Sequence, residues 1–137
     1  MDIDYLDFEK DIKATIEHYL LQNDFTEANT DNQPFTKNYV SKHWCIEISM
    51  INYFPHISPS FKFSNLSGEH CLPGTLNKLL KIEQNEVMTH YNDFKKRCGF
   101  DTQKIKMVYI CEMLELFYKP LIIGSVVFAD YQDFCSN

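Results

Sequence analysis

The stretch KHWCIEISMINYFPHISPSFKF, residues 42–63, alternates apolar and polar side chains, is interrupted by two prolines, and then alternates again. A period of two places every second side chain on the same face of a β-strand. Because Pro55 and Pro59 cannot donate hydrogen bonds to a central ladder, we expect residues 52–60 to form the connection. The stretch therefore predicts two strands with one apolar face, made of Trp44, Ile46, Ile48, Met50, Phe61 and Phe63.

Outward from this hairpin, the preceding segment FTKNYVSKH predicts a third strand at about residues 35–41. The polar run QNDFTEANTDNQP, residues 22–34, predicts a long loop before it. A small antiparallel sheet of about three strands with one apolar face needs helices to cover that face.

Helical periodicity predicts these helices before and after the strands in the sequence. Residues 5–22 predict an N-terminal helix with a buried stripe at spacings of three and four, formed by Tyr5, Phe8, Ile12, Ile16 and Tyr19. Residues 75–98 predict a second helix that ends at Gly99, with a buried side formed by Leu76, Leu80, Val87, Tyr91 and Phe94. A third follows Asp101 and ends or kinks at Pro120, and residues 121–137 predict a short irregular or helical tail. The chain is thus expected to form one α+β domain over residues 1–137.

Composition excludes several classes of protein. A chain of 137 residues with 45% apolar residues can bury one core. It has no apolar run long enough to span a membrane, and its acidic start differs from a signal peptide. Five cysteines without a C-x-x-C pair indicate reduced thiols, so we expect a cytoplasmic protein. Four glycines leave no phosphate-binding loop.

The net charge of −6 is concentrated at one end of the chain. Residues 1–31 hold nine acidic residues against two lysines, whereas the remaining residues are close to neutral. Such a charge repels nucleic acid and anionic membranes and attracts basic partners. Asp4, Asp7 and Asp11 fall on one stripe of the first predicted helix. Acids at a helix start also favour the helix dipole, so a functional and a structural explanation both remain open.

Cysteine and histidine give the strongest hints of chemistry. His43 and Cys45 lie two apart in a predicted strand, and His70 is next to Cys71 in a predicted loop. Adjacent ligands do not match the spacing of zinc sites, and we expect no metal and no cofactor. An enzyme that uses Cys71 with His70, or Glu47 as an acid or base, is an alternative, although the chain contains no established catalytic motif.

An acidic N-terminal helix, the hairpin WCIEISM…SFKF and the C-terminal segment YKPLIIGSVVFADYQDF together resemble the immunity proteins of bacterial polymorphic toxins. Those of contact-dependent growth-inhibition systems are the most similar type. The resemblance implies a protein that catalyses nothing. It implies instead a protein that binds a cognate toxin domain, often a nuclease, and blocks its active site or substrate surface.

The charge distribution adds candidate interface residues to this hypothesis. Nuclease domains are commonly basic because they neutralise phosphates, and an acidic edge attracts such a surface. We expect Asp4, Asp7 and Asp11 to contact the basic toxin, with Tyr39 and Tyr53 as aromatic anchors. The alternatives are the small cysteine- or carboxylate-dependent enzyme and a generic protein-interaction domain.

Overall fold

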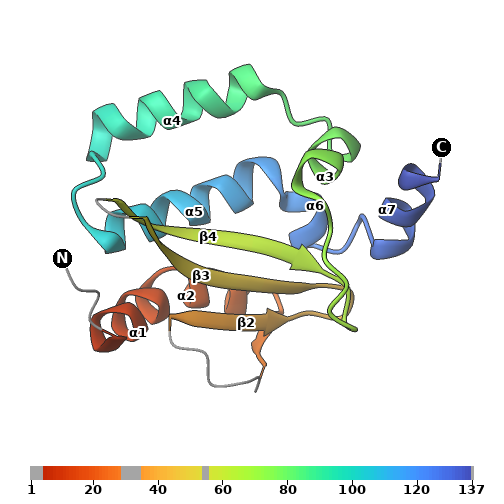
Figure 1. The fold of residues 1–137 in the computed structure, drawn as a ribbon, viewed down its shortest axis with the longest axis horizontal. Helices are drawn as coiled ribbons and strands as arrows, with labels where there is room; N and C mark the ends of the chain where they lie inside the picture. Colours follow the sequence, from red (N-terminus) through yellow and green to blue (C-terminus); the bar gives the residue numbers. More distant parts are fainter. Residues whose placement is uncertain (1–4, 29–34, 54–55, 137) are drawn as a thin grey trace.

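The computed structural model describes residues 5–28, 35–53 and 56–136, and only the backbone of residues 5–6, 51–53 and 56–58. The chain has the expected α+β architecture (Figure 1). Its elements are, in order, α1 (Tyr5–Ala14), α2 (Ile16–Gln22), β1 (Thr26–Glu27), β2 (Thr36–Val40), β3 (Cys45–Tyr53), β4 (His56–Ser64), α3 (Pro73–Leu79), α4 (Gln84–Cys98), α5 (Gln103–Phe117), α6 (Lys119–Ile122) and α7 (Phe128–Cys135). Among the described residues, no helix is both long and apolar enough to cross a membrane.

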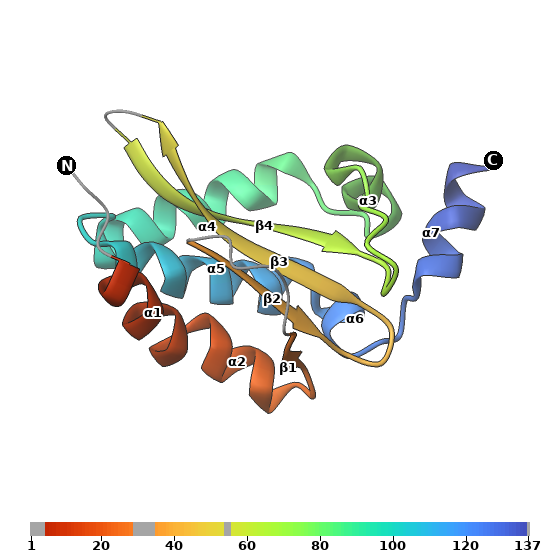
Figure 2. The same ribbon diagram turned by 60° about the horizontal axis from the view of Figure 1, so that its bottom comes forward.

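The strands form one antiparallel sheet in the order β1-β2-β3-β4 (Figure 2). Its register places Tyr39, Ile46 and Phe63 in one row, and Ile48 opposite Phe61 in the next. These apolar side chains share a face, as the alternation of the sequence predicts. The fourth strand, β1, lies inside the segment that we expected to be a loop. A strand of two residues is too short to show an alternating pattern in the sequence. Its pairing with β2 is what identifies it as a strand.

The hairpin connection is shorter than expected, because β3 and β4 pair as far as Tyr53 and His56. The prediction of a connection over residues 52–60 is therefore wrong. Pro59 lies within β4, opposite Met50. The Phe63 carbonyl accepts a hydrogen bond from the Cys71 amide, so the backbone polar groups of Phe63 point away from β3. Every second residue of a strand directs its backbone N–H and C=O groups to the same side, and Pro59 lies four residues before Phe63. Pro59 thus directs its nitrogen away from β3, where an edge strand tolerates proline.

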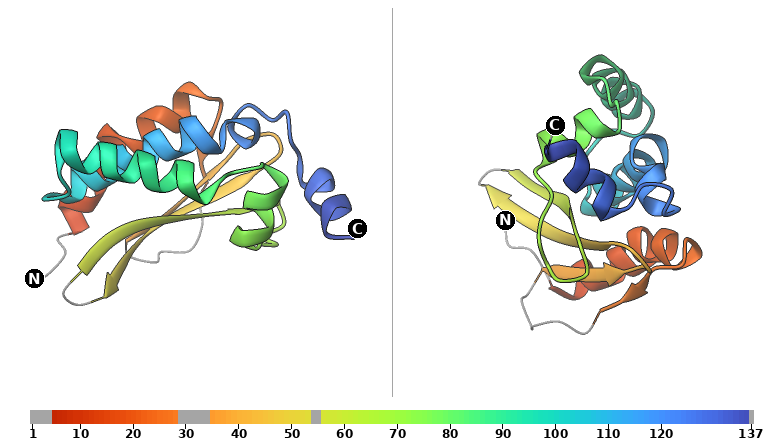
Figure 3. Two further views of the ribbon diagram at one scale, coloured as in Figure 1. Left: turned by 90° about the horizontal axis from the view of Figure 1, so that it is seen from above. Right: turned by 90° about the vertical axis from the view of Figure 1, so that its right-hand side faces the viewer.

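All the helices that cover the sheet lie on one of its faces (Figure 3). The helices α1, α2 and α5 rest on this face, and α4 lies beside α5, on the side away from α1 and α2. The fully buried side chains of this main core are Phe8, Ile12, Ile16, Leu20, Phe25, Tyr39, Trp44, Ile46, Ile48, Met107, Leu114 and Leu121. The opposite face of the sheet carries polar and small residues, among them Glu47 and Ser49.

Two of the predicted helices are interrupted. The N-terminal one breaks at Thr15, which has φ −124° and ψ −88°, and whose hydroxyl donates to the Asp11 carbonyl at 2.6 Å. The second divides into α3 and α4 around Lys81, which adopts a left-handed φ of 58°. The break changes which side of α4 is buried: His90 is buried with Phe94, whereas Tyr91 is exposed. The tail forms α7, in agreement with the helical option.

Trp44 connects the sheet to the C-terminal part of the chain. Its indole N–H donates to the Val126 carbonyl at 2.8 Å, just before α7. Its ring packs edge-on against Phe63 and contacts Phe128 of α7, each at 6.0 Å between centroids. One fully buried side chain, directly before β3, therefore contacts both β4 and α7.

We predict that Trp44→Phe lowers the free energy of unfolding by about 1–3 kcal/mol, because the Val126 carbonyl loses its donor and the smaller ring leaves a cavity. Urea denaturation followed by far-UV circular dichroism measures the change. Leu66→Ala, at a side chain that is 57% exposed, is the control and should change stability by less than about 0.5 kcal/mol. Equal stability of Trp44→Phe and the parent protein would contradict the assigned role.

Candidate functional site

The three aspartates of the expected toxin contact do not form one free edge. Asp7 is exposed on α1. Asp11 is partly buried and accepts a hydrogen bond from the Gln103 side-chain amide at 3.0 Å, which links α1 to α5. Asp4 lies outside the described residues. Of the two aspartates that are described, Asp7 is the one that faces solvent.

The tyrosines also differ from the expectation. Tyr39 has 0% exposure, which contradicts its predicted role as a surface anchor. The reason is the alternation of β2, which directs Tyr39 to the same covered face as its partner Ile46. Tyr53 ends β3 opposite His56, and its side chain is outside the described part of the structure.

Several acids of the N-terminal region instead surround Lys37, which shares the covered face of β2 with Tyr39. The Lys37 ammonium lies 2.9 Å from a Glu9 carboxylate oxygen and 2.8 Å from one of Glu27. Burial disfavours the charge on Lys37, but hydrogen bonds to Glu27 and Glu9 outweigh it and raise the pKa of the amine. These ion pairs join α1, β1 and β2, so part of the acidic charge stabilises the fold.

Glu17 of α2 adds a third carboxyl to this cluster. Burial and the negative charge of Glu27 raise the pKa of Glu17. The Tyr39 hydroxyl is buried, finds no hydrogen-bond partner among the described residues, and has its pKa raised by burial and by the nearby charge of Glu17. The sequence could have indicated this cluster. Lys37 and Tyr39 lie two residues apart in a strand, so their side chains share one face of the sheet. An amine on the covered face needs carboxylate partners.

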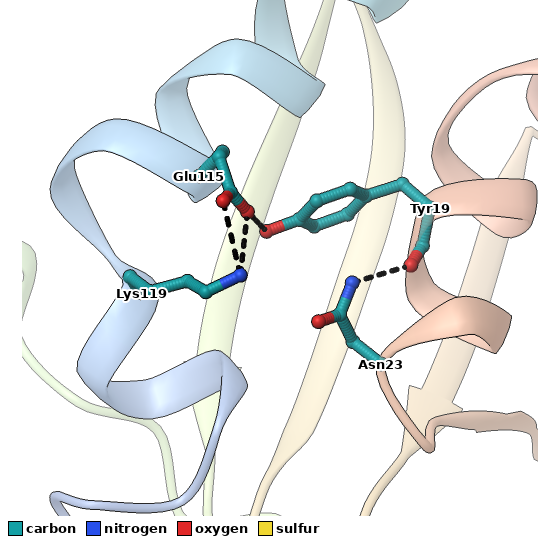
Figure 4. Close-up of polar contacts among 4 residues, drawn as sticks. All are labelled: Tyr19, Asn23, Glu115 and Lys119. Atoms are coloured by element: carbon teal, nitrogen blue, oxygen red, sulfur yellow. Dashed lines mark hydrogen bonds and ion pairs between the residues drawn. The ribbon is translucent and has the colours of Figure 1, made fainter.

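A second polar group joins α2 to α5 and α6 (Figure 4). The Tyr19 hydroxyl donates to Glu115 at 2.7 Å, and the Lys119 ammonium contacts both oxygens of the same carboxylate at 2.8 and 3.0 Å. Hydrogen bonds from Lys119 and Tyr19 lower the pKa of Glu115. The Asn23 side-chain amide donates to the Tyr19 carbonyl at 2.8 Å. All of these groups have partners within the chain, so we assign them a structural role.

A pocket of about 490 Å³ lies near this group. Lys42 and Asp24 bring opposite charges to it, so its lining favours neither an anion nor a cation. Its lining residues are Gln22, Asn23, Asp24, Ser41, Lys42, His43, Ile122, Ile123 and Gly124.

A groove between α4 and the end of α5 has a more uniform character. It also has a volume of about 490 Å³ and is lined by Asn85, Glu86, Thr89, His90, Asp93, Leu116 and Phe117. Two of these residues are acidic, and none is lysine or arginine. The groove is therefore the candidate functional site that best fits a positively charged group.

His90 is held firmly beside this groove. Its Nε2–H donates to a Glu112 carboxylate oxygen at 3.0 Å, and Arg97 donates to the same oxygen at 3.2 Å. Burial raises the pKa of Glu112, but the hydrogen bonds from His90 and Arg97 outweigh it and lower the pKa overall, so the carboxylate is ionised. The imidazole stacks on Tyr109 with 5.1 Å between ring centroids. Its orientation is thus fixed from two sides.

A cluster of aromatic rings also holds α4 against α5. The aromatic rings of Phe94, Phe100 and Tyr109 pack together at 5.2–5.3 Å between centroids. Phe94 is fully buried, yet it belongs to this aromatic cluster and not to the main core. The sequence pattern indicated a buried Phe94 but not a separate cluster, because periodicity does not reveal which element covers a helix.

The residues of the alternative enzyme lie in different environments. Cys71 is buried, and burial raises the pKa of its thiol to about 12. Its neighbour His70 is exposed. Burial also raises the pKa of Cys45. Glu47 lies on the open face of the sheet, opposite Lys62 in the register. Within the described ranges, no group of three or more histidine, cysteine or acidic side chains has a geometry that could hold a metal ion.

Comparisons with protein-family models, with curated proteins and with solved structures found no match.

We predict that Glu17→Gln makes the protein more stable at neutral pH. A carboxyl whose pKa is raised by folding binds its proton more tightly in the folded state, so stability falls as the pH rises above the unfolded-state value of 4.5. Glutamine mimics the protonated form and removes this loss. The variant should therefore exceed the parent protein in free energy of unfolding at pH 7 and approach it at pH 4. Glu69→Gln, at an exposed site, is the control, and the prediction fails if both variants behave alike.

We further predict two classes of thiol reactivity in the native protein at pH 7.5. Cys98 and Cys135 are exposed and should react with Ellman's reagent quickly. Cys71 and Cys111, each with a pKa raised to about 12 by burial, should react at least about tenfold more slowly, since only the thiolate attacks. Labelling followed by peptide mass spectrometry assigns the sites. A Cys71 that reacted faster than Cys98 would instead support the enzyme alternative.

Proposed function

We propose that the protein is a cytoplasmic immunity protein that binds and neutralises a basic toxin domain such as a nuclease. The observation that supports this proposal is the excess of carboxylates in the N-terminal quarter of the chain. Between residues 5 and 28, six acids accompany two lysines. Asp7, Asp24 and Glu27 among them are exposed to solvent.

The internal ion pairs reduce this negative charge without removing it. Lys37 neutralises one charge of the pair Glu9 and Glu27, and the raised pKa of Glu17 reduces its ionisation. The partner of Asp11 is the neutral side-chain amide of Gln103, which brings no positive charge to the segment. An excess of carboxylates attracts a basic surface over about a Debye length, roughly 8 Å at physiological salt.

Neutralisation requires no chemistry from this chain. A nuclease domain binds phosphates through lysine and arginine, and a protein that covers those side chains excludes the substrate. In this proposal, the acids speed the encounter and orient the two proteins, whereas the residues that give tight binding belong to the covered centre of the interface. Asp7 is the carboxylate on α1 that is best placed for this task, since Asp11 already has a partner.

The test begins with the genes that neighbour the gene for this chain and uses the C-terminal domain of a secreted toxin found there. Asp4→Asn with Asp7→Asn should lower the association rate constant about threefold to tenfold at low salt and weaken its salt dependence, because steering depends on net local charge. The dissociation rate constant should change less than about twofold. Surface plasmon resonance at several salt concentrations measures both constants.

Glu69→Gln with Asp133→Asn is the matched control, since it removes the same charge at exposed positions outside the N-terminal region. An equal decrease of the association rate constant in both double variants would show that the N-terminal acids have no special role. A parent protein that neither binds the toxin domain nor protects cells expressing it would overturn the proposed function itself.

A further inference from the structure

The pocket at the end of α2 is formed by three segments that lie far apart in the sequence and meet at one end of the sheet (Figure 2). They are the end of α2 with the residues that follow it, the turn between β2 and β3, and the end of α6. The volume of about 490 Å³ falls within the range of roughly 300–1,000 Å³ that is typical of sites for small molecules. The tertiary fold therefore creates this pocket, and no single element contains it.

Contacts within the fold hold the segments that carry the polar side chains of the pocket. In the turn, the Ser41 amide donates to the Trp44 carbonyl at 2.8 Å, and the Ser41 hydroxyl accepts from the Trp44 amide at 3.1 Å. The ring of His43 lies against Gly124, where an added β-carbon would be only 3.2 Å from the imidazole. Gly124 has a left-handed φ of 78°, which other residues rarely adopt. The turn is thus fixed against the end of α6.

The pocket carries one charge of each sign. Asp24 and Lys42 both line it, both are exposed, and neither forms an ion pair with a described residue. The imidazole of His43, next to Lys42, adds an N–H donor. An anion alone would face the Asp24 carboxylate, and a cation alone would face the Lys42 ammonium. A ligand that carries both charges would instead find a partner for each.

An apolar surface accompanies the two charges. Ile122 and Ile123 both line the pocket, and Ile123 leaves 61% of its surface exposed. An apolar group of a ligand that packed on Ile123 would remove apolar surface of both molecules from water, which is favourable in proportion to the area buried. The lining therefore matches a small molecule with a positive charge, a negative charge and an apolar group.

We infer that this pocket binds a free α-amino acid with an apolar side chain. The carboxylate of the ligand pairs with the Lys42 ammonium and accepts from the His43 ring, and its ammonium pairs with the Asp24 carboxylate. Its side chain covers Ile123. The toxin-binding test changes Asp4 and Asp7 and leaves these pocket residues intact, so either proposal can fail alone.

The test is an NMR titration of the full chain with L-leucine at about pH 7, where both charges of the ligand are present. We expect saturable shifts at the Ile123 methyl groups and the His43 ring, with a dissociation constant in the millimolar range because so small a ligand makes few contacts. Two analogues each lack one charge: 4-methylpentanoate has no amino group, and leucinamide has no carboxylate. Each should bind about threefold to tenfold more weakly than leucine, in line with the modest strength of exposed ion pairs.

Single substitutions identify which side chain meets which charge. Asp24→Asn retains a side chain of the same size and a residue type that tolerates the positive φ at this position. It should weaken leucine binding about threefold to tenfold without weakening the binding of 4-methylpentanoate. Lys42→Gln should weaken leucine binding by a similar factor without weakening the binding of leucinamide. Glu69→Gln and Lys95→Gln, at exposed positions outside the pocket, are the matched controls and should leave leucine binding unchanged.

Three results would overturn the inference. The first is the absence of saturable shifts at Ile123 and His43 up to the solubility limit of leucine in a protein that folds normally. The second is equal binding of leucine, 4-methylpentanoate and leucinamide, since that would show apolar contact without recognition of the charges. The third is an equal loss of leucine binding in Asp24→Asn and Glu69→Gln, because that would reflect net charge and not the pocket. Equal binding of glycine would overturn the choice of an apolar side chain.

Discussion

The structure depends on the burial of one apolar face of the β3–β4 hairpin. Trp44, Ile46 and Ile48 have no exposed surface, and complete burial of such side chains is worth roughly 1.5–3 kcal/mol each. The helices α1, α2 and α5 are amphipathic and cover this face, and α7 is attached through the indole of Trp44. Among the side chains that the structure describes, the other face has no comparable apolar surface, and the helices that cover the sheet lie on one face.

This one-sided arrangement explains why some of the N-terminal acids form ion pairs within the chain. Once β2 joins the sheet, Lys37 must lie on the covered side with Tyr39, where an amine without partners would be costly. Glu9 from α1 and Glu27 from β1 supply the opposite charge. The same carboxylates that give the segment its negative charge therefore help to position its helices, and charge counted along a sequence overstates what remains for a partner.

Much of the fold could be predicted from the sequence, because alternation and helical spacing report directly on which side chains are buried. They located the apolar face of the hairpin, the buried stripe of α1 and the end of α5 shortly before Pro120. They failed at β1, which is too short to show a pattern, and at Thr15 and Lys81, where the backbone breaks a helix. The groove could not be predicted from the sequence, because it forms where α4 packs against α5. That packing depends on tertiary contacts such as those of His90 with Glu112 and Tyr109.

The edge of the sheet at β4 has a consequence for how the molecule behaves in a crowded solution. An unpaired edge strand invites strands from other molecules, which is a common start of aggregation. At Pro59 the outward row of N–H donors has a gap, and at Phe63 the outward carbonyl is already occupied by the Cys71 amide. A foreign strand would meet both interruptions within five residues. The proline that we expected in the hairpin connection thus makes this edge a poorer template for a strand from another copy of the chain.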